Sequence, residues 1–152
     1  MKNQPFQFRG IAMTVRVATA ETSGAYALIE MIHPPSTGPA SHIHPLGPET
    51  FVVTEGEYVF TRGDESVHAR PGDCVIIPRG VPHRYRVGSS GGRALVICPP
   101  NLESYFLAMS DLLRSGAVSF RQEREIASQF GQEFLDDHGH WDTQRAEPTG
   151  GK

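Results

Sequence analysis

The 152-residue sequence contains no long hydrophobic run. No stretch approaches the roughly 18 consecutive apolar residues that a membrane-spanning helix needs. The N-terminal residues MKNQPFQFR also lack the apolar segment of a secretory signal. We therefore expect a cytoplasmic protein that has no membrane partner.

Positive charge is also limited. The chain has 14 Lys and Arg against 17 Asp and Glu, a formal net charge of −3, and its basic residues are dispersed. Domains that bind nucleic acid usually present clustered basic residues, and no segment resembles a helix-turn-helix. These features argue against nucleic acid and leave a small molecule as the expected partner.

Cysteine is scarce, with only Cys74 and Cys98 in the chain. Each lies in an apolar run of the kind that forms strands, where a reduced cysteine behaves as a small hydrophobic residue. We expect this packing role for both cysteines rather than redox chemistry.

What the sequence does have is a succession of short β-rich runs, separated by Gly, Pro, Ser and Asp. Such a succession predicts an all-β sandwich or barrel. We expect Gly56 and the segment 78–82 to form the turns of two hairpins, because Gly and Pro favour turns. The predicted strands span residues 11–17, 26–32, 49–53, 57–61, 66–69, 73–77, 83–87 and 93–98.

After residue 100, apolar side chains recur at helical spacing behind Asn101, a residue type that is common at a helix N-cap. A second helix is expected over residues 120–130, with Ser119 as its N-cap and Gly131 in the left-handed conformation at its end. The predicted organisation is an N-terminal arm over residues 1–10, a β-barrel over 11–100, a helical extension over 101–135 that packs on the barrel, and a flexible tail over 136–152.

Three histidines and one glutamate have the spacing of a metal site. His42 and His44 are separated by one residue, so on an extended strand both imidazoles project from the same face. Glu49 resumes the strand after a Pro-Gly bend, and His83 follows the second predicted turn. Burying these groups together is costly unless an ion neutralises them. We predict one divalent transition metal, Fe, Mn, Ni, Co or Zn, because imidazole and carboxylate do not discriminate among these ions.

The four residues lie in two stretches that resemble the two sequence motifs of the cupin family. Ser36 stands where the first motif has glycine and Val87 where the second often has asparagine, but neither position is a ligand. The resemblance implies a double-stranded β-helix, or jelly roll, and the helical tail is similar to that of small quercetin-dioxygenase-like cupins. The matching positions are His42, His44, Glu49 and Gly56 in the first motif, and Gly72, Pro78, Gly80 and His83 in the second.

Other side chains are candidates for a substrate pocket. If the strands alternate, Phe51 shares the inward face of Glu49, and Tyr85 shares that of His83. The expected pocket residues are Phe51, Tyr85, Phe60 and Met31.

The remaining histidines lack the spacing of ligands. We expect His33 and His68 on the surface, and His138 and His140 in a solvated tail.

The resemblance implies a metal-dependent dioxygenase that acts on a small oxygenated molecule, aromatic or polyketide-like. Four protein ligands leave one or two metal positions open, which favours catalysis over a closed structural site. Glu49 would then be both ligand and catalytic base, because a carboxylate that loosens its metal contact can accept a hydroxyl proton.

Two alternatives stay open. One is a redox-neutral polyketide cyclase or isomerase, in which the metal polarises a carbonyl group. The other is a non-catalytic module that binds a small molecule. A sulfonium lyase is disfavoured, because such cupins usually carry tyrosine where this chain has Phe51.

The N-terminal arm carries Phe6 and Phe8 in alternation, a pattern typical of a strand. Such a strand could pair with the edge of a partner's sheet. Because cupins commonly pair through their sheets, we expect a homodimer.

Overall fold

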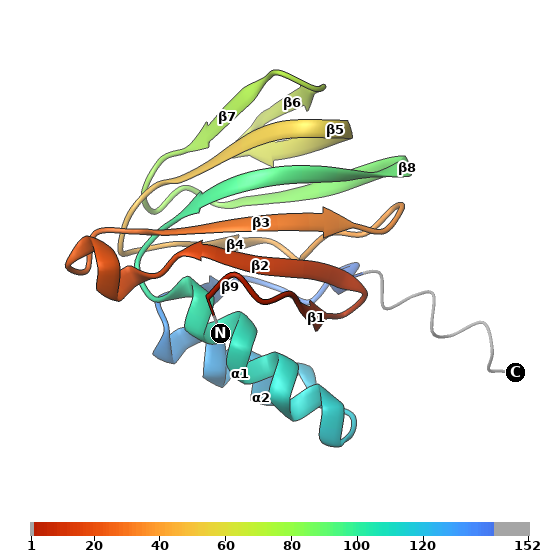
Figure 1. Cartoon of the computed structure of the whole chain (residues 1–152). Coiled ribbons are helices and arrows are strands. Elements are labelled where there is room, and N and C mark those ends of the chain that lie inside the picture. Colours follow the sequence, from red (N-terminus) through yellow and green to blue (C-terminus); the bar gives the residue numbers. More distant parts are fainter. Residues whose placement is uncertain (1, 142–152) are drawn as a thin grey trace, which may run out of the picture.

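The structure is a computed structural model that describes residues 2–141 of the chain. Its strands form one antiparallel sheet that rolls up on itself, and two helices lie together against the β1 side (Figure 1). The elements are β1 (Phe6–Phe8), β2 (Ile11–Val17), a short 3-10 helix (Thr19–Thr22), β3 (Ala27–His33), β4 (His42–Ile43), β5 (Glu49–Arg62), β6 (Glu65–Ala69), β7 (Cys74–Ile77), β8 (His83–Cys98), α1 (Leu102–Ser115), α2 (Phe120–Gln129) and β9 (Glu133–Phe134). The predicted all-β jelly roll with C-terminal helices is therefore confirmed.

Strand β8 organises the sheet. Its C-terminal half pairs with β3 on one side and with the first half of β5 on the other. Its N-terminal half pairs with the second half of β5, and His83 pairs with His42 of β4. The sheet order is β1-β2-β3-β8-β4-β9, while β5 also pairs with β6 and β7. Residues far apart in the sequence thus meet along one strand.

The predicted hairpin at Gly56 is wrong, because β5 continues through this residue without turning. Gly56 has a φ of +76°, and the register between β5 and β8 shifts on both sides of it. The inward positions are odd-numbered before the irregularity, as at Phe51, and even-numbered after it, as at Phe60. An extra residue in a strand kinks the ladder in this way. A glycine with positive φ therefore bends this strand rather than ending it.

The second predicted hairpin, around residues 78–82, is also wrong. Strand β7 pairs with β5 and not with β8, so this segment crosses from one strand partner to another. The two predicted strands 83–87 and 93–98 are halves of β8, which carries its own irregularity around Gly91, with φ +76°. Strands β4 and β9 have two residues each and were not predicted.

The interior is filled by alternating apolar side chains of the strands, such as Ile11, Met13 and Val15 of β2. Helix α1 buries Leu102, Tyr105, Phe106 and Met109 against the sheet and the second helix, as its apolar stripe predicts. Among the described residues, no helix is long and apolar enough to cross a membrane.

The helix ends were predicted with mixed success. Ser119 caps α2, since its side chain accepts a hydrogen bond from the Gln122 backbone at 3.1 Å, and Gly131 follows the helix with a φ of +83°. Asn101 precedes α1 but has a left-handed backbone and makes no side-chain capping hydrogen bond. Its backbone N–H instead donates to Thr19 Oγ1 at 2.9 Å.

Three predictions of exposure are wrong. His33 points inward from β3 and is buried, because the strand extends one residue beyond the predicted end. His140 is buried against the barrel, whereas His68 and His138 are exposed as expected. Cys74 is exposed on β7, so only Cys98 has the predicted packing role. The remainder of the predicted flexible tail, residues 142–152, lies outside the described residues.

Candidate metal centre

The four predicted ligands converge inside the rolled sheet. One ligand atom from each of His42, His44, Glu49 and His83 lies within 4.8 Å of the others, and all four residues are buried. His42 and His83 are neighbours across the β4–β8 pair. Glu49 is the first residue of β5, so its inward direction follows from the same alternation that buries Phe51. Local strand geometry therefore aims the side chains, and the sheet topology brings them together.

Backbone hydrogen bonds fix two of the imidazole rings. Nδ1 of His42 donates to the carbonyl of Ala40 at 2.8 Å, and Nδ1 of His83 donates to that of Val81 at 2.9 Å. A carbonyl oxygen can only accept, so the proton of each neutral ring resides on Nδ1. Nε2 of both rings is then a free electron-pair donor, as metal ligation requires.

The contacts around Glu49 test whether these residues fit a cation. Glu49 Oε1 lies 3.1 Å from His83 Nε2 and 3.2 Å from His44 Nε2. A carboxylate oxygen and an unprotonated nitrogen at this distance repel each other unless a proton or a cation lies between them. His44 has a buried Nδ1 without a hydrogen-bond partner among the described residues. The donor set therefore fits a bound metal ion better than an empty site.

The charge states agree with this role. Burial by itself would raise the pKa of Glu49, but the adjacent His44 and His83 rings outweigh burial and hold that pKa below its ordinary value. Burial, with a smaller contribution from the neighbouring rings, lowers the pKa of His42 well below its ordinary value. At neutral pH the cluster contains an anionic carboxylate and a neutral His42, which are the ligating forms. Imidazole and carboxylate ligands suit a divalent transition metal.

A small cavity lies beside the cluster. It encloses about 10 Å³, which is room for at most one water molecule. Three of the predicted pocket residues, Met31, Phe51 and Tyr85, line it, together with His42 and Glu49. Phe60 does not line it; its ring packs behind Phe51 at 4.8 Å and behind Tyr85 at 5.7 Å. The four candidate ligands, each at most 5% exposed, are therefore shielded from bulk solvent in this structure.

Four further lining residues were missed by the sequence analysis: Pro39, Phe106, Gln132 and Trp141. Phe106 was assigned only to helix packing, and Trp141 lies in a polar segment assigned to the tail. The one available signal was Trp141 itself, because it is the only tryptophan in the chain and a large apolar side chain is rarely left in solvent.

A buried histidine outside the ligand cluster supports the cavity wall. Nδ1 of His33 is 2.7 Å from the hydroxyl of Tyr58, and its Nε2 is 2.9 Å from the hydroxyl of Tyr85. Burial lowers the pKa of His33 to about 3, so the ring is neutral at physiological pH. The neutral ring donates to one tyrosine and accepts from the other. His33 therefore fixes Tyr85, whose ring forms part of the cavity.

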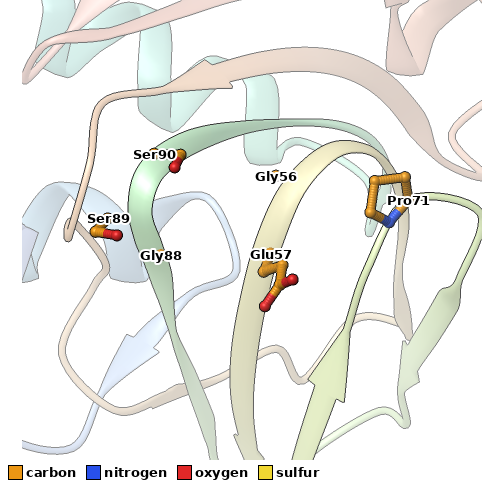
Figure 2. Close-up of a pocket in the computed structure, with 6 residues that line it drawn as sticks. All are labelled: Gly56, Glu57, Pro71, Gly88, Ser89 and Ser90. Carbon is orange, nitrogen blue, oxygen red and sulfur yellow. The ribbon is translucent and has the colours of Figure 1, made fainter.

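A wider pocket lies away from the ligands, at the bends of β5 and β8 (Figure 2). It has a volume of about 480 Å³ and is lined by Gly56, Glu57, Pro71, Gly88, Ser89 and Ser90. None of the four candidate ligands contributes to it. Its position follows from the irregularities at Gly56 and Gly91, which bend both strands.

Comparisons with known proteins agree with the fold and with the sequence motifs. A family model described as the cupin domain matches residues 29–99. The quercetin 2,3-dioxygenase of Bacillus subtilis is 25% identical over 95 residues, which are 62% of this chain and 28% of that protein. The chain therefore spans little more than a quarter of the length of this relative.

Solved structures show the same fold. The polyketide cyclase RemF from Streptomyces resistomycificus is 25% identical, with a TM-score of 0.51 over 59% of this chain and 64% of that one. KdgF from a Halomonas species is 14% identical, with a TM-score of 0.54 over 62% of this chain and 84% of that one. The family match, the rolled sheet and the cluster of three histidines and one glutamate together support a small protein of the cupin superfamily.

Proposed function

We propose that the chain is a metal-dependent enzyme that acts on a small oxygenated molecule, aromatic or polyketide-like, and that the reaction is a dioxygenation. The observation that carries this proposal is the buried cluster itself, in which three imidazoles and an ionised carboxylate face one another. The likeness to a quercetin 2,3-dioxygenase favours dioxygenation, although only part of that protein is matched.

The roles of the residues follow from their contacts. His42 and His83 hold their positions because their Nδ1 atoms are tied to backbone carbonyls. Among residues 2–141, Glu49 has no such tie to a backbone carbonyl, and its Oε1 lies within hydrogen-bond distance of His44 Nε2 and His83 Nε2. A bound divalent metal would supply Lewis acidity and, if redox-active, electrons for dioxygen. Glu49 is then the carboxylate free to accept the hydroxyl proton of the substrate.

The cavity walls support this chemistry by excluding water. Met31 and Phe51 present apolar surfaces beside Glu49, and both are almost fully buried. In such surroundings electrostatic interactions with the carboxylate are stronger than in water. A phenolic or enolic hydroxyl next to Glu49 would therefore lose its proton to a base held in a dry site.

The test combines elemental analysis with oxygen consumption. Protein purified without added metal should contain one transition-metal ion per chain, and protein reconstituted with Fe, Mn, Ni or Co should consume oxygen with a flavonol or a β-diketone. Absence of oxygen uptake with every metal and both substrate classes would contradict dioxygenation.

The second candidate is a redox-neutral cyclisation or isomerisation, favoured by the likeness to the polyketide cyclase RemF. This reaction needs only the Lewis acidity of the metal and a proton acceptor, both of which the same cluster can provide. Zinc in the purified protein, with a product of unchanged mass or of mass lowered by one water, would support it. Ligand binding without turnover under either condition would indicate a binding module.

We also propose that the chain forms a homodimer. Strand β1 pairs with β2 of its own chain, through Phe6 with Met13 and Phe8 with Ile11. It ends the sheet order, and α1 covers part of its outer edge, where Ser110 Oγ donates to Gln7 O at 2.7 Å; the rest of this edge would pair with a strand of a second copy.

A further inference from the structure

The metal centre is closed by a segment that comes from outside the barrel motifs. Residues 132–141, here named the gate, follow Gly131 at the end of α2. Gln132 and Trp141 from this segment line the cavity beside His42 and Glu49. With a volume of about 10 Å³, that cavity cannot admit a flavonol, a diketone or any other organic ligand. Something must move before such a molecule reaches the ligands.

The gate is attached to residues 38–43 by backbone hydrogen bonds, and to other parts of the molecule by Arg86 Nη2, which donates to Gly139 O at 2.6 Å, and by the buried rings of Phe134 and Trp141. Leu135 N–H donates to Ser41 O at 2.9 Å, and Trp141 N–H donates to Gly38 O at 2.6 Å. The β4–β9 ladder is only two residues long. By contrast, β5 and β8 are paired along most of their length. Short ladders at the edge of a fold open more readily than long central ones, so the gate is the part of this wall that can open.

Side chains on both sides hold the end of the gate, since Arg86 Nη2 donates to Gly139 O at 2.6 Å and His140 contacts the barrel and α2. His140 Nδ1 accepts a hydrogen bond from Ala40 N–H at 3.0 Å, so Nε2 carries the proton of the neutral ring. This Nε2 lies 3.0 Å from Glu123 Oε2. Glu123 is anchored in turn by Arg9, whose Nη2 is 2.7 Å from Oε1. The next residue, Trp141, is thereby placed over the cavity.

Two properties distinguish Trp141 and Gln132 from ordinary core residues. Trp141 has a φ of +48°, a backbone conformation that costs energy for a bulky side chain. Gln132 is 3% exposed and lines the cavity; its carboxamide has no hydrogen bond to another residue in the range 2–141, and its polar atoms are not among the fully buried, unpaired ones. An amide that faces a cavity without a protein partner can hydrogen-bond with a ligand that enters it. Trp141 also packs in the core, with its ring 5.2 Å from that of Phe8, so both residues combine a structural role with a position beside the cavity.

We propose that residues 132–141 form a gate that swings about Gly131, and that Trp141 determines which ligands reach the metal. Opening exposes the cavity, and the Gln132 carboxamide then offers a hydrogen bond to an oxygen of the incoming molecule. This inference rests on the proposed metal centre, but it does not depend on which reaction occurs there.

The intrinsic fluorescence of the chain gives the first test, because Trp141 is the only tryptophan. The Zn(II)-loaded protein is titrated with acetohydroxamate, a bidentate oxygen ligand. We expect the emission of the buried indole to shift to longer wavelength on binding, since the opened gate exposes it to water. Binding measured by calorimetry with no change in emission would overturn the proposal.

A pair of substitutions tests the role of Trp141 by kinetics. In Co(II)-loaded protein, Trp141→Ala should raise the association rate of acetohydroxamate by about tenfold or more, because the barrier to entry is removed. Trp141→Phe keeps an aromatic plug and should stay within about threefold of the unaltered protein. Equal rates for Trp141→Ala and the unaltered protein, at equal cobalt content, would contradict the proposal.

A disulfide can lock the same gate. Ile43 and Glu133 are cross-strand partners of β4 and β9, at a separation suited to a disulfide. The double variant Ile43→Cys, Glu133→Cys is made in a Cys74→Ser background, because Cys74 is exposed. The association rate of acetohydroxamate should be lower by about tenfold or more in the oxidised Co(II) protein than in the same protein after reduction. Equal rates in the two redox states would show that the gate does not open along this strand pair.

All three tests measure ligand binding and none measures turnover. A protein without enzyme activity could therefore pass them, so failure of the gate and failure of the proposed enzyme activity are distinguishable.

Discussion

Glu49 differs from the three histidines around it in how it is held. His42 and His83 are fixed by backbone carbonyls, whereas the polar partners of Glu49 in the described part of the chain are the nitrogens of His44 and His83. Removing the carboxylate charge should therefore weaken the site without removing the fold. It should also separate metal binding from proton transfer, since both functions are proposed for the same side chain.

Glu49→Gln tests this assignment. The amide is isosteric but neutral and cannot act as a base, so we expect metal affinity to fall by about tenfold or more, equivalent to roughly 1.4 kcal/mol. Turnover should be lost even at saturating metal. Competition with a coloured chelator measures the affinity. Glu57→Gln is the matched control, because Glu57 is exposed on the same strand and far from the cluster; an equal effect of both substitutions would contradict the role of Glu49.

His33 predicts a pH dependence of stability in the metal-free protein. Burial lowers the pKa of His33 to about 3 in the folded state, whereas its pKa in the unfolded chain is near the ordinary value of 6.5. Below pH 6.5, His33 becomes protonated in the unfolded chain but remains neutral in the folded protein. The free energy of unfolding should therefore fall as the pH falls, by up to about 1.4 kcal/mol per pH unit from this residue.

The contribution of His33 can be isolated by substitution. His33→Gln can still hydrogen-bond with Tyr58 and Tyr85 but has no proton to gain, so the loss of stability between pH 7 and pH 5 should be smaller. Urea unfolding of both proteins at the two pH values measures the difference. Identical pH dependence in both proteins would mean that burial of His33 does not determine this slope.

At the scale of elements, β5 and β8 owe their bends to glycines rather than to turns. Gly56 has a φ of +76°, and a Cβ placed there would overlap the carbonyl oxygen of Gly91. The bend matters for the site, because it shifts the inward face from the parity of Glu49 to that of Phe60. Both ends of one strand can therefore face the same interior.

Gly56→Ala should destabilise the protein by about 2–4 kcal/mol, from the positive φ and from the overlap with Gly91. Gly24→Ala is the control, because Gly24 has a φ of +88° but no atom within 4 Å of an added Cβ. It should lose only the conformational part, about 1 kcal/mol. Chemical unfolding measures both, and equal losses would show that the close approach of β5 and β8 is unimportant.

At the scale of the whole molecule, the proposed dimer depends on the outer edge of β1. Gln7 lies on the exposed face of this strand, between the inward Phe8 and the partly buried Phe6. Edge lysines oppose pairing between sheets. Gln7→Lys should therefore shift sedimentation from dimer towards monomer, whereas Gln4→Lys, in the preceding exposed segment, should not. A dimer that persists unchanged with Gln7→Lys would place the interface elsewhere.

The sequence was sufficient to predict that the four candidate ligands lie together, and to predict most strands. Strand β2 has its predicted bounds, because strict alternation from Ile11 to Val17 needs no long-range information. The candidate ligands could be predicted because His42 and His44, two residues apart on an extended strand, lie on the same face. The N-cap of α2 at Ser119 could be predicted for a similar reason, since a capping box involves only residues close in the sequence.

Other features were decided by contacts between distant segments. A glycine such as Gly56 is compatible with both a turn and a bulge, and only its pairing with β8 selects the bulge. His33 is compatible with solvent until Tyr58 and Tyr85 bring their hydroxyls to its ring. The two-residue strand β9 has no periodicity from which it could be predicted, so its place next to β4 is visible only in the folded chain.

The sequence by itself thus determined which atoms can bind a metal, because residue type and strand alternation fix the donors and their direction. The tertiary structure decided whether anything can reach them. Trp141 lies 58 residues after His83 in the printed sequence, yet it covers the same cavity that His42 and Glu49 line. The cavity is covered because the chain packs against the barrel again after α2. Neither local propensity nor residue spacing predicts where that segment packs. The ligands are a property of the sequence, and access to them is a property of the fold.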